Sequence, residues 1–153
     1  MTPVTWSVAT MYRRWPTKAD LVYAAVLEGI SQEAVDPDTG TLRGDLLAIG
    51  HTVSRQAREH AATMRAVLAE NSRDAELGNV VREQFFGQRK KEIAAVLHRA
   101  VERGEIRAEA ITDELWDLLP GYPVYRAVVQ DRPPTARTVT ALVDDVILPS
   151  LTR

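Results

Sequence analysis

The chain has 153 residues, of which 45% are hydrophobic and 26% charged, and its formal net charge is −2. These values are typical of one globular domain with a real core. The absence of cysteine excludes disulfides and thiolate metal sites. No apolar run is long enough to span a bilayer and no secretory signal pattern is present, so we expect a cytoplasmic protein without membrane contact.

The charge is unevenly distributed along the chain. Residues 1–18 contain Arg13, Arg14 and Lys18 and no acidic residue, which leaves a net charge of −5 on the rest. A basic end on an acidic body is typical of a surface that meets phosphates. Three charges can also gather in a terminal segment by chance.

Apolar residues spaced three and four apart predict an all-α fold of about six helices. Residues 7–15 predict a short helix that ends before a proline. Thr17, with Asp20 three residues later, predicts the start of the next helix. Residues 36–40, DPDTG, predict a turn.

The middle of the chain predicts longer helices. Residues 42–68 carry one apolar stripe, which indicates either one long helix or two helices with a break near residues 58–60. Residues 71–76 have the polar and acidic composition of a new helix start. That helix is expected to run to Arg103, because Gly104 suits a left-handed C-terminal position.

The C-terminal third predicts two further helices. One begins near Ala110 and meets Pro120 and Pro123, which we expect to break or kink it. Thr135 is expected to cap a last amphipathic helix that continues through Val146.

Residues 8–26, VATMYRRWPTKADLVYAAV, resemble the end of the helix-turn-helix in the TetR family of transcriptional repressors. The segments GTLRGDLLAIG, AAVLHRAVERGEIR and DLLPGYPVYRAVV resemble ligand-binding helices of one large TetR subgroup. The resemblance implies a partial helix-turn-helix over residues 1–18 and a helical effector-binding and dimerisation domain over residues 19–153. The residues that fit the helix-turn-helix pattern are Thr10, Met11, Tyr12, Trp15, Lys18 and Asp20.

The resemblance implies that residues 7–15 are the recognition helix, which lies in the major groove of operator DNA. Its polar side chains would contact base edges or phosphates, and Trp15 would pack beneath the corner. Tyr12 and Trp15 are alternatively ordinary core aromatics of a helical hairpin. The DNA-binding residues expected on this basis are Ser7, Thr10, Tyr12, Arg13, Arg14 and Lys18.

In the family, two helices of the module precede the recognition helix. Helices average about eleven or twelve residues, so two of them do not fit in the six residues before Ser7. We therefore expect that this chain begins inside the module and that its DNA binding is impaired. We also expect residues 1–15 to be poorly ordered or displaced relative to a complete homologue.

The last two helices are predicted to pair with those of a second copy into a four-helix interface. The segment from Ile111 to Val129 has apolar residues around most of its circumference, so it needs more than one surface to pack against. Packing inside a monomer is the alternative. The interface residues expected are Leu115, Leu119, Val128, Val139, Leu142, Val143 and Val146.

Arg89 lies in the middle of the apolar stripe of its helix, with Glu92 three residues later. A basic side chain on such a stripe must pair, reach solvent or meet a polar group. The simpler interpretation is a local Arg89–Glu92 pair at a subunit edge. The sharper one is a cavity for an apolar or aromatic effector, anionic in one version, beside the proline kink. The ligand-binding residues expected are Phe85, Phe86, Arg89, Trp116, Tyr122 and Tyr125.

The sequence thus predicts a TetR-like, ligand-responsive repressor that forms a homodimer and binds operator DNA when its N-terminal module is complete. The alternative is a DNA-independent small-molecule-binding or dimerisation module that pairs with a full-length relative. No cofactor and no metal are expected, because the three histidines have no ligand spacing. An enzyme is not expected, because no nucleophile elbow or Gly-rich phosphate loop is present.

Overall fold

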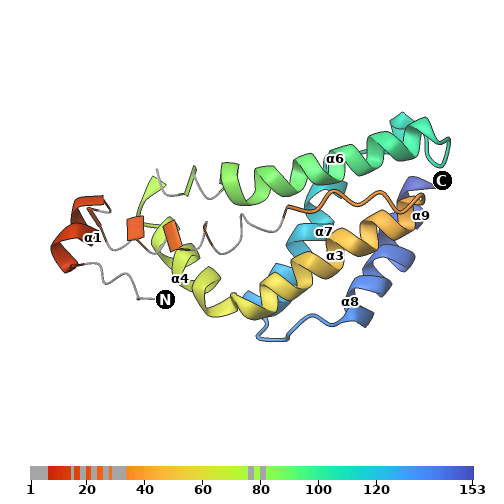
Figure 1. The fold of residues 1–153 in the computed structure, drawn as a ribbon. Helices are drawn as coiled ribbons and strands as arrows, with labels where there is room; N and C mark the ends of the chain where they lie inside the picture. Colours follow the sequence, from red (N-terminus) through yellow and green to blue (C-terminus); the bar gives the residue numbers. More distant parts are fainter. Residues whose placement is uncertain are drawn as a thin grey trace, which may run out of the picture.

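The computed structural model describes residues 7–14, 16–17, 20–21, 24–25, 28, 34–75, 78–79 and 82–153, and for Gln84 and Phe85 the backbone alone. Every regular element in these ranges is a helix, which confirms the predicted all-α class. The central helix α3 (Leu42–Glu59) contacts α6 (Gly87–Glu102) and α7 (Leu115–Val124), as well as α8 (Ala136–Ala141) (Figure 1). No described helix is long and apolar enough to cross a membrane.

The N-terminal helix α1 spans Val8–Arg14, as the sequence predicts. Beyond it, the backbone N–H of Thr17 donates to Asp20 Oδ2 at 3.1 Å, and the N–H of Asp20 donates to Thr17 Oγ1 at 3.1 Å. This reciprocal pair is the predicted helix start.

Residues 42–71 form two helices, α3 and α4 (Ala61–Asn71). The break lies at His60, whose φ of −116° and ψ of 17° are not helical. The second of the two alternatives, a break near residues 58–60, is therefore the correct one. The helix predicted from residues 71–76 falls partly outside the described residues.

The start of α3 is held by side chains from both directions along the chain. Thr41 Oγ1 accepts from the N–H of Gly44 at 3.0 Å, and Glu105 Oε2 accepts from the N–H of Leu42 at 2.9 Å. The hydrogen bond from Leu42 is the main cause that holds the pKa of Glu105 below its usual value, and Arg103 adds to it. Two of the N–H groups that a helix start leaves without partners are thereby satisfied.

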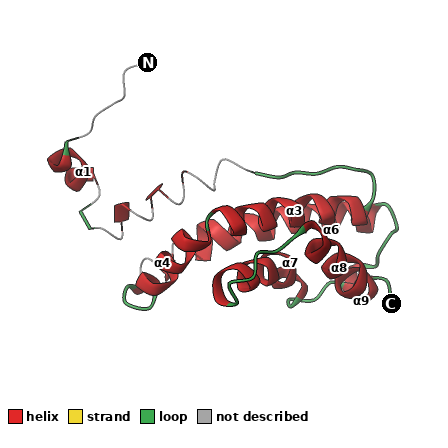
Figure 2. Cartoon of the chain, turned by 90° about the horizontal axis from the view of Figure 1, so that it is seen from below, coloured by secondary structure: helices red, strands yellow, loops and turns green. Residues whose placement is uncertain are grey.

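Residues 34–41, called the strap here, run beside α3 toward its N-terminus (Figures 1 and 2). The N–H of Val35 donates to Glu92 Oε1 at 3.0 Å, and Arg99 Nη1 lies 3.1 Å from Asp36 Oδ1. At its other end the N–H of Thr39 donates to Asp45 Oδ1 at 2.7 Å. The predicted turn over residues 36–40 is limited to a bend at Gly40, whose φ is 92°, and at Thr41. The strap is fastened to both α6 and α3.

Helix α6 follows a π-helical turn, η1 (Arg82–Phe86), and ends at Glu102. Gly104 has a φ of 76°, its N–H donates to the carbonyl of Val101, and the N–H of Glu105 donates to the carbonyl of Ala100. These two bonds define a Schellman motif. The predicted left-handed glycine is confirmed.

Helix α7 passes through Pro120 and Pro123 without ending, and a π-helical segment, η3 (Tyr125–Val129), continues it. Of the two expected outcomes the break is therefore wrong, and the kink stays a prediction. Each proline lacks one N–H donor, but its fixed φ is compatible with a helix, and both prolines are buried against neighbouring elements. A short helical turn, η2 (Ala108–Ala110), precedes α7.

The last helical stretch comprises α8, the π-helical η4 (Leu142–Ile147) and α9 (Leu148–Leu151). Thr135 caps it through a reciprocal box with Thr138, as predicted. Arg43 of α3 pairs with Asp144 of η4 at 2.7 Å. The hydrogen bond from Arg43 lowers the pKa of Asp144.

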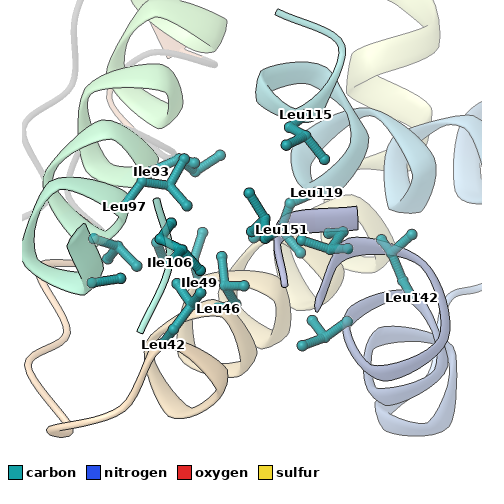
Figure 3. Packing of buried hydrophobic residues seen from close by; sticks show 14 of the residues in the cluster. Leu42, Leu46, Ile49, Ile93, Leu97, Ile106, Leu115, Leu119, Leu142 and Leu151 are labelled. Atoms are coloured by element: carbon teal, nitrogen blue, oxygen red, sulfur yellow. The ribbon is translucent and has the colours of Figure 1, made fainter. Parts of the chain in front are cut away.

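The main core is formed by side chains from α3, α6, α7 and the last helical stretch, which meet between these helices (Figure 3). Gly50 of α3 lies at the closest approach, since a Cβ added to it would stand 2.5 Å from Val139 Cγ1 and 3.2 Å from Leu119 Cδ1. A second, smaller cluster lies at the far end of α3. It contains Ala57, Met64, Val67, Ala127 and Val128.

Candidate functional site

The first candidate site is the basic end of α1. No residue of this helix is buried, and Tyr12 is 57% exposed. Arg13 and Arg14 lie in its last turn and are exposed. Both guanidiniums are thus presented where phosphates could reach them, while Lys18 and Trp15 lie outside the described residues.

Ser7 and Thr10 have a local structural role at the start of α1. Their hydroxyl oxygens lie 2.6 Å apart, and the N–H of Thr10 donates to Ser7 Oγ at 3.2 Å. Ser7 is therefore the N-cap of the helix. A contact of either hydroxyl with DNA stays a prediction.

The second candidate site is a cavity of about 30 Å³ at the junction of α3, α4, α6 and α7. This volume is enough for about one or two water molecules. Among the described side chains its wall is apolar except for Gln56 and Arg89. The lining residues are Val53, Gln56, Met64, Phe86, Arg89, Pro120 and Val124.

The polar end of this cavity belongs to a cluster of three side chains, of which Gln56 and Arg89 line the wall and Glu92 pairs with Arg89 without lining it. Arg89 Nη1 donates to Glu92 Oε2 at 2.6 Å, and Arg89 Nη2 donates to Gln56 Oε1 at 2.7 Å. The side chains of Arg89 and Glu92 are only 8% and 9% exposed. The local Arg89–Glu92 pair, one of the two sequence interpretations, is present, but it is buried inside the subunit.

A wider hollow opens to the surface beside the cavity. It measures about 420 Å³ and lies between the start of α6 and the proline segment of α7. Phe86 and Pro120 line both spaces and so stand between them. Lys90 and Asp117 both line it and form an ion pair, with Nζ and Oδ1 3.5 Å apart. The hollow has the size of a small-molecule site, and the cavity lies behind it.

Three of the expected ligand-binding residues lie elsewhere. Tyr122 and Tyr125 are 38% and 48% exposed, and Trp116 packs half-buried against the main core. None of the three lines the cavity or the hollow. These three rings therefore do not form the wall around Arg89 that the sequence predicted. Phe86 and Arg89 do line the cavity, and the side chain of Phe85 lies outside the described residues.

The sequence interpretation missed Gln56 and Met64. Gln56 lies seven residues after Ile49, on the same face of α3, and is 5% exposed. A polar residue within an apolar stripe is the signal that singled out Arg89, and it applies equally to Gln56.

The third candidate site is an open groove between α7 and α8, about 670 Å³ in volume. Its wall is partly apolar, with Val146 44% exposed, and Arg126 lies 5.9 Å from the centre of the Tyr122 ring. Arg126, Arg137 and Asp145 give it charges of both signs. Such a mixed surface suits the same surface of a second copy.

Six of the seven expected interface residues lie inside the subunit itself. Val139 and Val143 have no exposed surface, so they can bury nothing further against a partner. The assignment is corrected because core and interface stripes have the same spacing in a sequence. Val146 alone is exposed, and the corrected core residues are Leu115, Leu119, Val128, Val139, Leu142 and Val143.

Comparison with known proteins shows the class. The model of the tetracyclin repressor-like C-terminal domain matches residues 36–146, which include most of the strap and the residues that line the cavity and the groove. The chain therefore belongs to the TetR family of transcriptional regulators.

Particular relatives agree with this placement. An uncharacterized HTH-type transcriptional regulator of Mycobacterium tuberculosis is 58% identical over 147 residues, which cover 96% of this chain and 73% of the relative. The DNA-binding transcriptional repressor TetR of Mycobacteroides abscessus is 30% identical and matches 93% of this chain and 75% of its own length. A crystal structure of a TetR family transcription regulator matches 96% of this chain and 81% of its own, with a TM-score of 0.77 and 28% identity.

Proposed function

We propose that the protein is a repressor whose hold on operator DNA is controlled by a small apolar or aromatic effector. The family match over residues 36–146 carries this proposal. Regulators of this family bind operator DNA and act as dimers. In this proposal the protein acts in the cytoplasm, and repression needs neither a catalytic step nor a cofactor.

For the DNA-binding end, we propose that α1 is the recognition helix. In the polypeptide of residues 1–153 we expect weak DNA binding, because α1 has seven residues and none of them is buried. A helix this short is marginal unless tertiary contacts hold it. The dimerisation module that works without DNA is the alternative, and α1's lack of buried residues is the observation that favours it.

For the effector, we propose the hollow between α6 and α7 with the cavity behind it. The hollow offers the volume, and Gln56 and Arg89 offer polar groups at its inner end. Ligand entry requires Phe86 to move, because Phe86 lines both spaces. Effector binding would then shift the balance between two conformations through its different affinity for them.

For the subunit interface, we propose the α7–α8 groove, with Val146, Tyr122 and Leu118 as contact residues instead of the core residues predicted earlier. Val146→Asp places a charge on this surface and should weaken self-association, because the charge loses its water in the interface. Analytical ultracentrifugation measures the effect. Val129→Asp, on an exposed residue outside the groove wall, is the matched control.

The experiment that tests the function uses a version of the chain in which two helices of a TetR-family helix-turn-helix are placed before α1. Fragments of genomic DNA that bind to this protein are selected first. The affinity for one selected fragment is then measured by fluorescence anisotropy over a range of salt concentrations. A dimer that binds one pseudo-palindromic site with a steep salt dependence supports the repressor. Replacing Lys18 by alanine should weaken binding to all sequences and flatten that dependence by about one phosphate contact per subunit. If the protein is a dimer but binds no DNA fragment, the alternative of a dimerisation module that works without DNA would be favoured.

A further inference from the structure

The polar end of the cavity carries no net charge, although it contains an arginine. The guanidinium of Arg89 contacts the carboxylate of Glu92 at 2.6 Å, and both side chains are more than nine-tenths buried. Gln56, the third member, is uncharged. Because the two opposite charges touch inside the protein, a molecule entering the cavity meets a dipole and not a cation.

This neutrality decides which ligands can be bound tightly. Moving a carboxylate from water into a buried site costs far more free energy than moving an amide or hydroxyl group. Only an opposite charge in need of a partner offsets that cost. Arg89 already has Glu92, whose carboxylate would also repel a second anion on the same guanidinium. The sequence interpretation of an anionic effector is therefore disfavoured.

We propose that the effector site selects uncharged ligands, and that Glu92 determines this specificity by cancelling the charge of Arg89. The ligand class is a small aromatic or aliphatic molecule with an amide, carbonyl or hydroxyl group. This inference rests on the proposed effector site and adds the chemical class that the site accepts. Glu92 is a specificity-determining residue without lining the cavity itself.

The charges at the rim of the hollow do not reverse this preference. Lys90 is 52% exposed and pairs with Asp117, which is 75% exposed. Arg82 is also exposed and donates to Asn79. Charges in such contact with water are screened by solvent and salt, so they add little to the binding of an anion.

Glu92 has a second role that the test must respect. Its Oε1 accepts from the N–H of Val35, so its replacement by an apolar residue would also release the strap. Glu92→Gln keeps an oxygen for that N–H and removes only the charge. It leaves the Arg89 guanidinium as a buried cation without its anionic partner.

The test compares phenylacetamide with phenylacetate, which have the same shape and differ in charge, by titration calorimetry at neutral pH. We expect the wild-type protein to bind the amide at least roughly tenfold more tightly. In Glu92→Gln the order reverses, because phenylacetate now pairs with Arg89. Lys91→Gln, which removes an exposed charge of the same helix outside the wall of the hollow, leaves the wild-type order unchanged.

Arg89→Gln gives a second, opposite test and covers the case in which Glu92→Gln does not fold. It leaves the carboxylate of Glu92 as the buried charge. Phenethylamine, a cation of similar shape, should then bind roughly tenfold more tightly than it binds the wild-type protein.

The outcomes separate this inference from the proposed function. Equal wild-type affinities for phenylacetamide and phenylacetate, or an unchanged order in Glu92→Gln, would overturn charge selection and leave the effector site standing. Failure of Arg89→Gln to gain affinity for phenethylamine would also overturn it. Absence of binding of both wild-type probes at millimolar concentration would overturn the effector site, and this inference with it.

Discussion

The two ends of α3 are packed in different ways. Toward its N-terminus, Leu42, Leu46 and Ile49 are at most 2% exposed and belong to an apolar core (Figure 3). Toward its C-terminus the helix presents Gln56 to a buried arginine and borders an open volume of about 30 Å³. One helix therefore belongs both to a close-packed layer and to the wall of a cavity.

The difference shows how stability and adaptability are divided in this domain. A close-packed apolar layer resists change, because any added or removed volume is felt by its neighbours. A junction with unfilled volume and a polar cluster has more than one acceptable arrangement. The elements that respond to ligands are drawn from such less stable regions. We therefore expect the free energy of unfolding to depend most on charge at the cavity end of α3. At the packed end it should depend most on side-chain volume.

The largest effect is expected at the cavity end. Arg89→Met leaves the Glu92 carboxylate buried without its cation, which should lower the free energy of unfolding by about 3 to 5 kcal/mol. The double variant Arg89→Met, Glu92→Met removes both charges and should lose much less. Urea denaturation at fixed protein concentration measures both. Equal losses in the single and double variants would show that the pair matters only through its packing.

At the packed end, Leu46→Ala should lower the free energy of unfolding by about 3 kcal/mol, because it opens a cavity in a layer that cannot collapse. Met64→Ala at the other end is the matched comparison. It should lose less, since the neighbouring wall is already incomplete. Denaturant titration of the two variants decides the order. A larger loss of stability for Met64→Ala would show that the cavity end of α3, and not the packed end, is the more sensitive to lost volume.

Glu105 should contribute a smaller, pH-dependent amount at the packed end. Glu105→Gln removes a charged acceptor from the N–H of Leu42, for a loss of about 1 kcal/mol at neutral pH. The pKa of Glu105 is lowered in the folded state, so this stability is present above the unfolded pKa and is lost as pH falls through the folded pKa. Thermal unfolding of both proteins from neutral to acidic pH should show the difference shrink. A difference that grows in acid would contradict the assignment.

The smallest effect is expected at the mouth of the hollow. Lys90→Gln removes the exposed pair with Asp117, and the free energy of unfolding should change by no more than about 0.5 kcal/mol. Differential scanning calorimetry at low and high salt measures it. A loss of several kilocalories that salt abolishes would show that this pair closes the hollow firmly.

The local features of the fold could be predicted from the sequence because their causes are local. Thr135 and Gly104 each determine a helix boundary through their own backbone and side chain. The break at His60 could be given only as one of two alternatives, because a single apolar stripe runs across it. Pro120 misled the prediction, because its burial against other helices offsets a missing hydrogen bond and no local pattern shows that burial.

The candidate site could be predicted only in part. Arg89 was found because a charge interrupts an apolar stripe. Its partner Gln56 lies 33 residues earlier, and that contact exists only once α3 and α6 are packed together. Tyr122 and Tyr125 were assigned to the site because they lie beside the prolines in the sequence, and nearness in sequence does not show that a side chain is exposed. Val139 and Val143 were assigned to an interface because a buried stripe does not say what buries it.

The missing side chain of Gly50 links two positions far apart in the sequence. Because even a methyl group there would collide with Val139, residues 50 and 139 share one fixed volume. A homologue with a larger side chain at one of these positions needs a smaller side chain at the other. The residues at the two positions should therefore vary together in an alignment of homologues. Since α8 leads directly into η4, which carries Val146 of the groove wall, we expect a change of volume at residue 50 to shift the outer groove as well.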